Sequence, residues 1–259
     1  MDLGIAGKRA LICASSKGLG RGCAHALADA GVNLVMNARG AEMLETSAQE
    51  IRDAYGVDVT TVAADISTAD GQAAVLAAGG DVDILVNNAG GPPAGKWPDW
   101  EREDFIKALD SNMLAPIALI KALVPGMMDR GWGRVVNTTS HSVRAPVGIL
   151  GLSTAARAGL TGYVAGTSRQ VAGSGVTINN LLPGVHDTDR IKTLNGDSAI
   201  AQGISPQQAR SNWEALIPAG RYGTPEEFGA TCAFLCSQFS GFIVGQNIVL
   251  DGGESNITI

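Results

Sequence analysis

The chain has 259 residues, of which 45% are hydrophobic and 17% charged, proportions typical of one folded α/β domain rather than a disordered chain. The formal net charge of -6 and the lack of any block of Lys or Arg argue against a nucleic-acid-binding surface. We expect no apolar run long enough for a membrane span, and residues 1–4 lack the features of a signal peptide, so a cytoplasmic protein without a membrane partner is predicted.

Short β-rich segments alternate with longer helical patterns, the order typical of a parallel sheet covered by helices on both faces. Strands are predicted, in chain order, at Arg9–Cys13, Asn33–Met36, Val59–Ala63, Ile84–Val86, Val135–Thr138, Thr177–Leu181 and Ile248–Leu250. Helices are predicted at Leu19–Ala30, Ala41–Tyr55, Asn112–Arg130, Leu152–Ala172 and Pro225–Ser237. Residues 1–259 are therefore predicted to form one α/β domain, a doubly wound parallel sheet of about seven strands. Residues 185–222 interrupt the strand order and are expected to be an irregular segment that covers a substrate.

A glycine-rich loop follows the first predicted strand, which ends at Cys13, and opens a helix. Glycines let backbone N–H groups approach a pyrophosphate, and the helix N-terminus favours negative charge. A plain tight turn is the alternative, but the position in the first strand–helix unit favours a dinucleotide. The candidate binding residues are Ser15, Ser16, Lys17, Gly18, Leu19 and Gly20.

The end of the second predicted strand decides which dinucleotide is expected. An acidic residue there would bind the ribose 2′-hydroxyl of NAD, but the sequence reads Asn37-Ala38-Arg39. Arg39 and Lys17 can instead pair with a 2′-phosphate, although both can also be solvated surface charges. NADP(H) is therefore predicted over NAD(H).

Further motifs lie at the ends of later strands, and each of them alone can be a structural turn. They are Asp65-Ile66, Asn87-Asn88-Ala89-Gly90, Pro183-Gly184 with Thr188, and Asp251-Gly252-Gly253. In this order, together with the glycine loop, they make the chain resemble the short-chain dehydrogenase/reductase family from Lys8 to Gly253.

The resemblance implies a Rossmann fold and specific cofactor contacts. It assigns Asp65 and Ile66 to the adenine, and the segment Asn88, Ala89 and Gly90 to the cofactor ribose. It assigns Pro183, Gly184 and Thr188 to the nicotinamide amide. The family's glycine loop begins with a glycine where this chain has Ala14, so we expect a slightly altered turn.

The catalytic positions of the family are only partly matched. Family members hold a carbonyl with Ser and Tyr, use Lys to lower the pKa of that Tyr, and support a proton-relay water with Asn. The resemblance places Asn112 and Ser140 at the Asn and Ser positions, but Ser153 and Arg157 at those of Tyr and Lys. Ser153 and Arg157 are four residues apart and share a helix face. Arg stays protonated and cannot relay a proton, so the usual acid is missing.

Other groups near the site are candidates for proton delivery. His141 and His186 are two of them, because an imidazole is the side chain best matched to acid chemistry near pH 7, although a structural or surface role is an alternative for each. A water held by Ser140, Ser153 and Asn112 is a third source. Tyr163 lies too far along the helix for this role. Three tryptophans are expected to rim the pocket as an apolar wall or to pack its loops: Trp97, Trp100 and Trp213.

Three functions are compatible with these residues. The first is an NADP(H)-dependent reductase or dehydrogenase of a small carbonyl or alcohol substrate, similar to the ketoacyl-carrier-protein reductase branch. The second is a dinucleotide-binding sensor or partner subunit without redox turnover, favoured by the double change at Ser153 and Arg157. The third is a non-redox enzyme resembling the halohydrin dehalogenases, which the retained glycine loop disfavours. We favour the first.

Metal binding is not predicted, because Cys232 and Cys236 lack a second cysteine pair or clustered His; all four cysteines are interpreted as reduced core thiols. The family resemblance implies a homotetramer or homodimer assembled through helices 112–130 and 152–172 and the C-terminal segment. Packing within one subunit is the alternative for the small residues of the second helix, which are Ala155, Ala158, Gly159, Gly162, Ala165 and Gly166.

Overall fold

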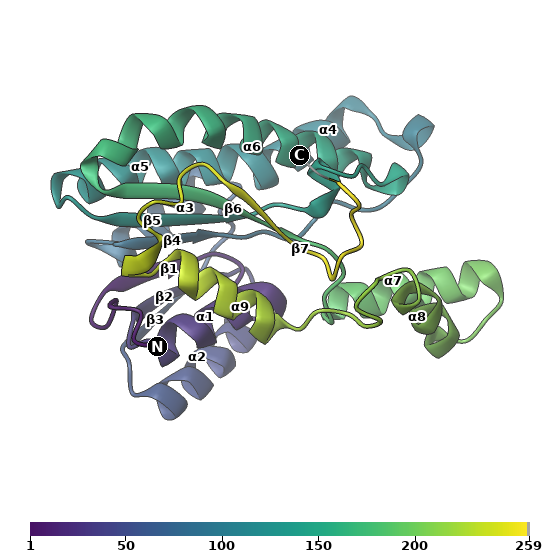
Figure 1. The fold of residues 1–259 in the computed structure, drawn as a ribbon, viewed down its shortest axis with the longest axis horizontal. Helices are drawn as coiled ribbons and strands as arrows, with labels where there is room; N and C mark the ends of the chain where they lie inside the picture. Colours follow the sequence, from purple (N-terminus) through teal and green to yellow (C-terminus); the bar gives the residue numbers. More distant parts are fainter. Residues whose placement is uncertain (258–259) are drawn as a thin grey trace.

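The computed structural model describes residues 1–257 and is built on a seven-stranded parallel sheet of order β3-β2-β1-β4-β5-β6-β7 (Figure 1). The strands are β1 (Arg9–Ile12), β2 (Asn33–Ala38), β3 (Val59–Ala63), β4 (Ile84–Asn87), β5 (Gly133–Thr138), β6 (Val176–Pro183) and β7 (Asn247–Leu250). The order reverses between β1 and β4, which is where open parallel sheets bind their ligands. The predicted doubly wound α/β sheet is confirmed.

Two layers of helices cover the sheet, as Figure 1 shows. One face carries α1 (Gly18–Asp29), α2 (Ala41–Tyr55) and α9 (Pro225–Leu235), whose apolar side chains share one core cluster. The other face carries α3 (Ala69–Gly79), α5 (Ala115–Asp129) and α6 (Gly151–Val171), which share a second cluster. The sheet is therefore buried on both sides, as its continuous aliphatic strands predict.

Three helices lie outside this pattern: α4 (Arg102–Leu109), α7 (Asp189–Gln202) and α8 (Pro206–Glu214). The prediction that residues 185–222 are irregular is wrong, because α7 and α8 occupy much of this segment and project from the body (Figure 1). Helix α7 was not predicted because it buries only Asn195 and Ala199, so its sequence has almost no regular spacing of apolar residues. The short helices α3 and α4 were likewise not predicted.

Helices α4 and α5 are joined without a break by a π-helical turn, η2 (Asp110–Leu114). The resulting helix, Arg102–Asp129, has 28 residues and a most apolar stretch with mean hydropathy 1.3, long and apolar enough to cross a membrane. The expectation that no apolar run reaches this length is therefore wrong. Because Leu119, Ile120 and Val124 pack into the core against the sheet, the apolar character of α5 has an explanation within the fold.

Helices α1 and α9 pack closely through glycines. A Cβ added to Gly229 would run into the backbone of Gly22, and one added to Gly22 would run into Pro225. The thiols of Cys23, Cys232 and Cys236 are buried near this contact, and Cys13 is buried at the end of β1. Burial raises the pKa of Cys13 to about 12, which keeps that thiol protonated. The predicted burial of all four cysteines is confirmed.

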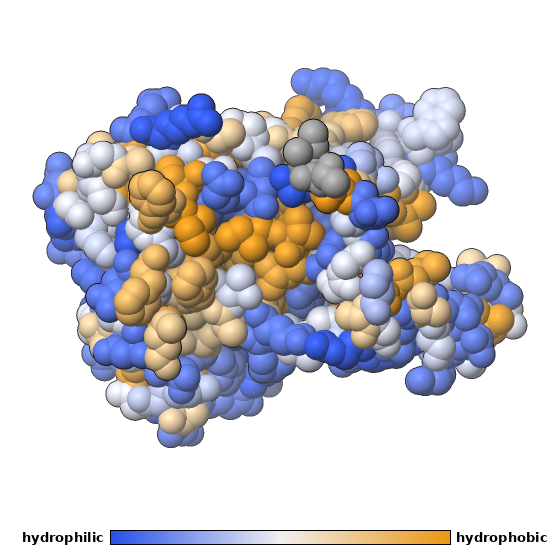
Figure 2. All heavy atoms as spheres, in the orientation of Figure 1, coloured by the Kyte–Doolittle hydropathy of each residue, from blue (hydrophilic) through white to orange (hydrophobic). Residues whose placement is uncertain are grey.

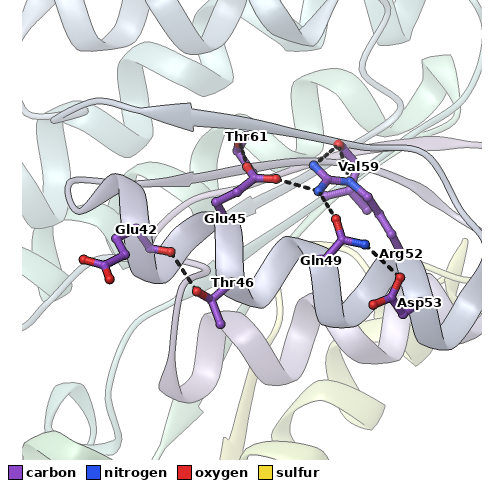
Figure 3. Close-up of polar contacts among 8 residues, drawn as sticks. All are labelled: Glu42, Glu45, Thr46, Gln49, Arg52, Asp53, Val59 and Thr61. Atoms are coloured by element: carbon purple, nitrogen blue, oxygen red, sulfur yellow. Dashed lines mark hydrogen bonds and ion pairs between the residues drawn. The ribbon is translucent and has the colours of Figure 1, made fainter.

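A polar cluster holds α2 against the edge strand β3 (Figure 3). Arg52 donates through Nη2 to the carbonyl of Val59 (2.7 Å) and through Nη1 to Glu45 Oε1 (2.6 Å). Glu45 Oε2 accepts from the hydroxyl of Thr61 (2.7 Å), and the Arg52 hydrogen bond lowers the pKa of this carboxyl. These contacts tie α2, from Glu45 to its last turn at Arg52, to the neighbouring strand β3.

Candidate active site

The loop after β1 keeps a glycine-like turn although it begins with alanine. Ala14 has φ of 47°, the only positive φ of a non-glycine residue within residues 1–257. The left-handed conformation costs an L-residue roughly 1–2 kcal/mol. The turn therefore keeps a conformation that suits glycine, instead of the altered turn that we expected, and the backbone of Ala14 is strained. Its carbonyl accepts a hydrogen bond from Asn88 Nδ2 (3.3 Å), which ties this loop to the segment after β4.

The same loop leaves little room for side chains where backbone must come close. A Cβ on Gly20 would lie 2.8 Å from Asn88 Nδ2 and would overlap the Ala14 carbonyl. Lys17 is the N-cap of α1 and makes no side-chain capping bond, so backbone N–H groups of the first turn remain for an anion. This is the cradle that a pyrophosphate requires.

The other predicted loop residues differ in what they face. Ser15 is fully buried, and its N–H and hydroxyl both bond Asn37, so it fastens the loop to β2. The Ser16 carbonyl accepts from Ser47 on α2 (2.8 Å), and Leu19 packs against the core. Ser15 and Leu19 therefore stabilise the conformation of the loop and are not part of its exposed surface.

The positions expected to contact the adenosine end lie beside β2 and β3. Asp65 is exposed and accepts from the N–H and hydroxyl of Ser67 (3.0 and 2.7 Å). These hydrogen bonds lower the pKa of Asp65, with a smaller contribution from the charge of Arg39. Arg39 is exposed, whereas Ile66 packs into the core beneath. Arg39 is thus positioned for an anionic group near the end of β2.

Arg157 is the most constrained of the predicted catalytic residues. Its Nε donates to Ser153 Oγ (3.1 Å), and its Nη1 donates to the carbonyls of Thr138 and Thr139. Nη2 reaches the carbonyl of Ala89 (3.4 Å). Within residues 1–257 no carboxylate lies within ion-pair distance of this guanidinium. Burial, and then the charge of Arg190, lower the pKa of Arg157 to about 10, which still leaves it cationic at neutral pH.

A small cavity of about 10 Å³, room for about one water molecule, lies beside Arg157. Its lining residues are Asn87, Asn88, Ala89, Ser111, Asn112, Pro116, Thr138 and Arg157. Three of these residues carry a buried polar atom that has no hydrogen-bond partner within residues 1–257: Asn87 Oδ1, Asn112 Oδ1 and Thr138 Oγ1. Asn112 lies in the π-helical turn η2 rather than at a helix start, and such turns are frequent at functional sites. The structure thus brings Asn112 and Arg157 together around unsatisfied polar groups.

Ser140 ends a chain of hydroxyl groups that the sequence analysis did not identify. Thr154 Oγ1 donates to Ser142 Oγ (3.1 Å), and Ser142 Oγ donates to Ser140 Oγ (2.9 Å). Ser140 Oγ also accepts from the N–H of Ser142 (3.1 Å). With its acceptor capacity filled, the Ser140 hydroxyl has its own hydrogen to donate. In the sequence, only the position of Thr154 next to Ser153 could have indicated this chain of hydroxyl groups.

A row of asparagine amides crosses the sheet from the end of β4 to the start of β7, another feature that was not predicted. Asn87 Nδ2 donates to Asn137 Oδ1 (2.8 Å), and Asn137 Nδ2 donates to Asn180 Oδ1 (3.1 Å). Asn180 Nδ2 donates to Asn247 Oδ1 (2.8 Å). The four residues are paired in register. The row leads from the edge strand to the cavity, where the Asn87 oxygen is unpaired.

The two candidate histidines have different surroundings. His186 packs edge-on against Phe228, with ring centroids 5.6 Å apart, and its Nδ1 lies 3.3 Å from the carbonyl of Gly184. Burial lowers the pKa of His186, which favours the neutral ring. His141 instead places its Nδ1 3.5 Å from Glu254 Oε2. His186 therefore fits a structural role better than His141 does.

The segment after β6 is fastened over the site. Thr188 is the residue directly before α7. A Cβ added to Gly18 would lie 3.4 Å from the methyl group of Thr188, so the segment reaches the glycine loop. Arg190 donates to the carbonyls of Gly91 (2.7 Å) and Pro92 (2.9 Å). Pro183 ends β6, and the N–H of Gly184 bonds the carbonyl of Leu250 on the neighbouring strand (2.8 Å). Figure 2 shows the surface hollowed between the body and α7–α8.

The tryptophans do not line the cavity beside Arg157. Trp97 is 82% exposed, and Trp100 packs edge-on against Phe105 in a small apolar cluster near the start of α6. Trp213 lies on α8 and packs against the cluster that contains Val185. Packing of the surrounding segments, the alternative considered for these residues, accounts for Trp100 and Trp213.

Comparison with known proteins places this site in a family. The protein-family model described as Enoyl-(Acyl carrier protein) reductase matches residues 13–255. The chain is 33% identical over 257 residues to 3-oxoacyl-[acyl-carrier-protein] reductase of Vibrio cholerae, covering 97% of this chain and 98% of that protein. It is 32% identical over 254 residues to gluconate 5-dehydrogenase of Gluconobacter oxydans, covering 96% and 95%.

Solved structures agree with these relatives. L-sorbose reductase from Gluconobacter frateurii, complexed with NADPH and L-sorbose, matches with a TM-score of 0.95 at 28% identity over 100% of both chains. A 3-oxoacyl (acyl-carrier-protein) reductase from Agrobacterium tumefaciens with NADP bound matches with a TM-score of 0.88 at 30% identity, covering 97% of this chain and 96% of that chain. The chain therefore belongs to the short-chain dehydrogenase/reductase family of oxidoreductases.

Proposed function

We propose that the protein is an NADP(H)-dependent oxidoreductase that interconverts a small carbonyl compound and its alcohol through an atypical active site. The observation that carries this proposal is the convergence of the glycine loop, Ser140 and the buried Arg157 at the carboxyl edge of β1, β4 and β5. The similarity to L-sorbose reductase complexed with NADPH, to an NADP-bound 3-oxoacyl (acyl-carrier-protein) reductase and to 3-oxoacyl-[acyl-carrier-protein] reductase of Vibrio cholerae supports it.

The residues present fit a dinucleotide with a 2′-phosphate. The first turn of α1 offers backbone N–H groups, and Gly20 leaves space that any Cβ would fill. Arg39 and Lys17 supply cations at the expected phosphate positions, and residues 36–39 carry no carboxylate. When bound, the nicotinamide supplies the hydride for carbonyl reduction. The segment 185–222 is proposed to cover the substrate, because Arg190 and Thr188 hold it against the two cofactor loops.

The chain's own side chains polarise the carbonyl. The Ser140 hydroxyl is free to donate to the substrate oxygen, because Ser142 already satisfies its acceptor capacity. Arg157 adds a fixed positive charge and orders the loops after β4 and β5 through their carbonyls. Ser153 and Arg157 stand where the family resemblance implies Tyr and Lys, and neither supplies a proton near neutral pH. His141, His186 or a water beside Asn112 remain the candidate proton sources.

One observation favours the second candidate function, dinucleotide binding without redox turnover. The Arg157 guanidinium is saturated by Ser153 and backbone carbonyls, so it orders the site without taking part in proton transfer. A sensor or partner subunit would need no more than this. Retention of the full hydroxyl chain to Ser140 favours the enzyme, since a binding protein does not need it.

We also propose a homotetramer or homodimer. The small residues of α6 lie mostly on its exposed side, including Gly159, Gly162 and Gly166, which allows a close approach by another copy. Figure 2 shows a second apolar area over α9 and β7, and this segment exposes Phe239 and Phe242. A cytoplasmic location without nucleic-acid or membrane partners is part of the same proposal.

The test is a fluorescence titration of the protein with NADPH and NADH, repeated on Arg39→Ala. We expect Arg39→Ala to weaken NADPH binding about 10- to 100-fold, since charge-assisted phosphate contacts contribute roughly 1.5–3 kcal/mol. Binding of NADH should change less than about twofold. Arg102→Ala, which alters an exposed arginine on α4, is the matched control. Equal affinity for both nucleotides in the unmodified protein would contradict the NADP preference.

Turnover is then measured by the nicotinamide absorbance with acetoacetyl-CoA, L-sorbose, gluconate with NADP⁺, and crotonyl-CoA. Turnover of a ketone or alcohol supports the oxidoreductase. Tight NADPH binding without turnover would favour the sensor or partner subunit. Failure to bind either nucleotide would overturn both and leave the non-redox enzyme.

A further inference from the structure

We propose that His141 is the proton donor of the carbonyl reduction and that Glu254, at the C-terminal end of the chain, is its positioning residue. This inference rests on the proposed oxidoreductase function. It gives the site an acid that replaces the tyrosine expected from the family resemblance, and it uses a carboxylate that no sequence motif identified.

The pair lies at the carboxyl edge of the sheet, on the same side as Ser140. His141 directly follows Ser140 and begins a short 3₁₀ helix, η3 (His141–Val143), after β5. A Cβ added to Gly184, at the end of β6, would lie 3.1 Å from His141 Nδ1. The ring therefore packs against the backbone that follows β6, and His141 is the residue directly after the serine that is proposed to bind the carbonyl.

The C-terminal turn presents Glu254 to this ring. Asp251 follows β7, and its carboxylate accepts from the N–H groups of Gly253 (2.9 Å) and Ser255 (2.8 Å). The N–H of Glu254 bonds the carbonyl of Asp251 (3.2 Å). These bonds close the turn and place Glu254 Oε2 3.5 Å from His141 Nδ1. The carboxylate of Asp251 is occupied by its own turn, so Glu254 is the one available to the ring.

The two nitrogens of His141 are not equivalent. Within residues 1–257, Nδ1 and Glu254 Oε2 are both buried and neither has a hydrogen-bond partner of good geometry, so each is the group closest to satisfying the other. The ring is 8% exposed overall, and Nε2 is not among the sealed atoms. A carboxylate that accepts from Nδ1–H fixes the ring orientation and leaves Nε2 to exchange a proton with a reacting group.

The charges around the ring are consistent with a proton donor. Glu254 and Asp251 face it from the C-terminal turn, and Arg144 ends its own 3₁₀ helix. Arg157 lies on α6, across the loop after β5, with its donors directed at the carbonyls of Thr138 and Thr139. Glu254 is therefore the carboxylate that meets the ring of His141, whereas the charge of Arg157 is directed at backbone carbonyls.

The carbonyl carbon gains a C–H bond and two electrons from the reduced nicotinamide, which is oxidised, and the carbonyl π electrons pass to oxygen. That oxygen, held by the Ser140 hydroxyl, forms an O–H bond with the proton from His141 Nε2. The imidazole is left neutral with its remaining proton on Nδ1, shared with Glu254, and water returns the proton to Nε2.

Two variants test the assignment. With NADPH and acetoacetyl-CoA or L-sorbose as the ketone probe, His141→Gln should lower kcat by about 10²- to 10⁴-fold. Glu254→Leu should lower kcat by about 10- to 100-fold, as loss of an orienting partner does. NADPH affinity should change little in either. His25→Gln and Glu226→Gln, which alter a histidine and a carboxylate outside the site, should keep kcat within about twofold of the unmodified protein.

A structural readout separates positioning from general damage. The chain has three histidines, so ¹⁵N spectra of the imidazole rings can be assigned with the single variants. Neutral His141 should carry its proton on Nδ1 in the unmodified protein and shift toward the Nε2–H form in Glu254→Leu. The signals of His25 and His186 should not move, which also shows that the variant is folded.

The outcomes are distinguishable. An active unmodified protein whose His141→Gln variant keeps kcat within about threefold overturns the proton role alone. An unchanged tautomer in Glu254→Leu overturns the positioning role of Glu254. If the unmodified protein binds NADPH but reduces no ketone, the proposed function fails and the proton role fails with it. A loss of kcat in His141→Gln without loss of NADPH binding supports both.

Discussion

Arg157 and Ser153 lie one turn apart on α6, and the Arg157 Nε donates a hydrogen bond to the Ser153 hydroxyl at 3.1 Å. The remaining nitrogens of Arg157 bond carbonyls at the ends of β4 and β5. A buried cation is thus held by dipoles rather than by a carboxylate. The arrangement orders the carboxyl edge of the sheet, and it leaves proton transfer to another residue.

We expect Arg157→Met to lower the free energy of unfolding by about 2–4 kcal/mol, because it leaves the Thr138 and Thr139 carbonyls buried without donors. Removing a desolvated charge offsets part of this loss. Two orphaned carbonyls outweigh that gain, since each costs roughly 1–3 kcal/mol. Urea denaturation measures the change, with Arg169→Met on the exposed side of the same helix as the control. Equal or greater stability of Arg157→Met would show that the carbonyls find other donors.

The double variant Ser153→Tyr with Arg157→Lys tests the proposal of an atypical active site. It restores the residues that the family resemblance implies, so we expect kcat for ketone reduction to rise and to depend less on His141. Ser153→Tyr alone should gain less, because a tyrosine without a lysine keeps its ordinary pKa near 10. Adding His141→Gln to each background and measuring kcat forms a double-mutant cycle. Equal losses in both backgrounds would mean that the tyrosine does not take over proton donation.

Ala14→Gly should stabilise the protein by about 0.5–1 kcal/mol. Alanine with φ of 47° is strained, and glycine adopts this conformation without strain. The greater entropy of glycine in the unfolded chain removes part of the gain. Thermal unfolding monitors the effect. Ala10→Gly is the matched control, because Ala10 is buried within β1 in ordinary strand geometry and its substitution should destabilise.

The fold was predictable because strands buried on both faces are continuous aliphatic runs, such as Ile84–Val86, and these can be recognised in a single sequence. Helices α7 and α8 were not, because they bury few apolar residues. The family resemblance assigned Ser140, after the fifth predicted strand, and Arg157, on the helix that follows. The contacts of Ser142 with Thr154 and of His141 with Glu254 could not be predicted in this way, because these residues come together only when the chain folds.

Glu227 should make stability depend on pH in acid. Hydrogen bonds from Arg221, and then from the N–H of Thr224, lower the pKa of Glu227 to about 2 in the folded protein from an ordinary value of 4.5. A carboxyl whose pKa is lower when folded contributes stability above pH about 4.5 and loses it as the pH falls toward 2. We expect Glu227→Gln to remove this part of the pH dependence in acid-unfolding curves. Glu226→Gln, which alters the neighbouring exposed carboxylate, should not.

The asparagine row gives the last prediction. Asn137 is fully buried, and its amide both accepts from Asn87 and donates to Asn180. Asn137→Leu keeps the volume but leaves a donor on one side and an acceptor on the other unpaired, so we expect a loss of about 2–4 kcal/mol in unfolding free energy. Asn247→Leu removes only the end of the row, next to the edge of the sheet, and should cost about 1 kcal/mol. Urea unfolding of both variants compares them. Equal losses would mean that the amides act as separate pairs, whereas the larger loss at Asn137 indicates a connected row that holds Asn87 at the cavity beside Arg157.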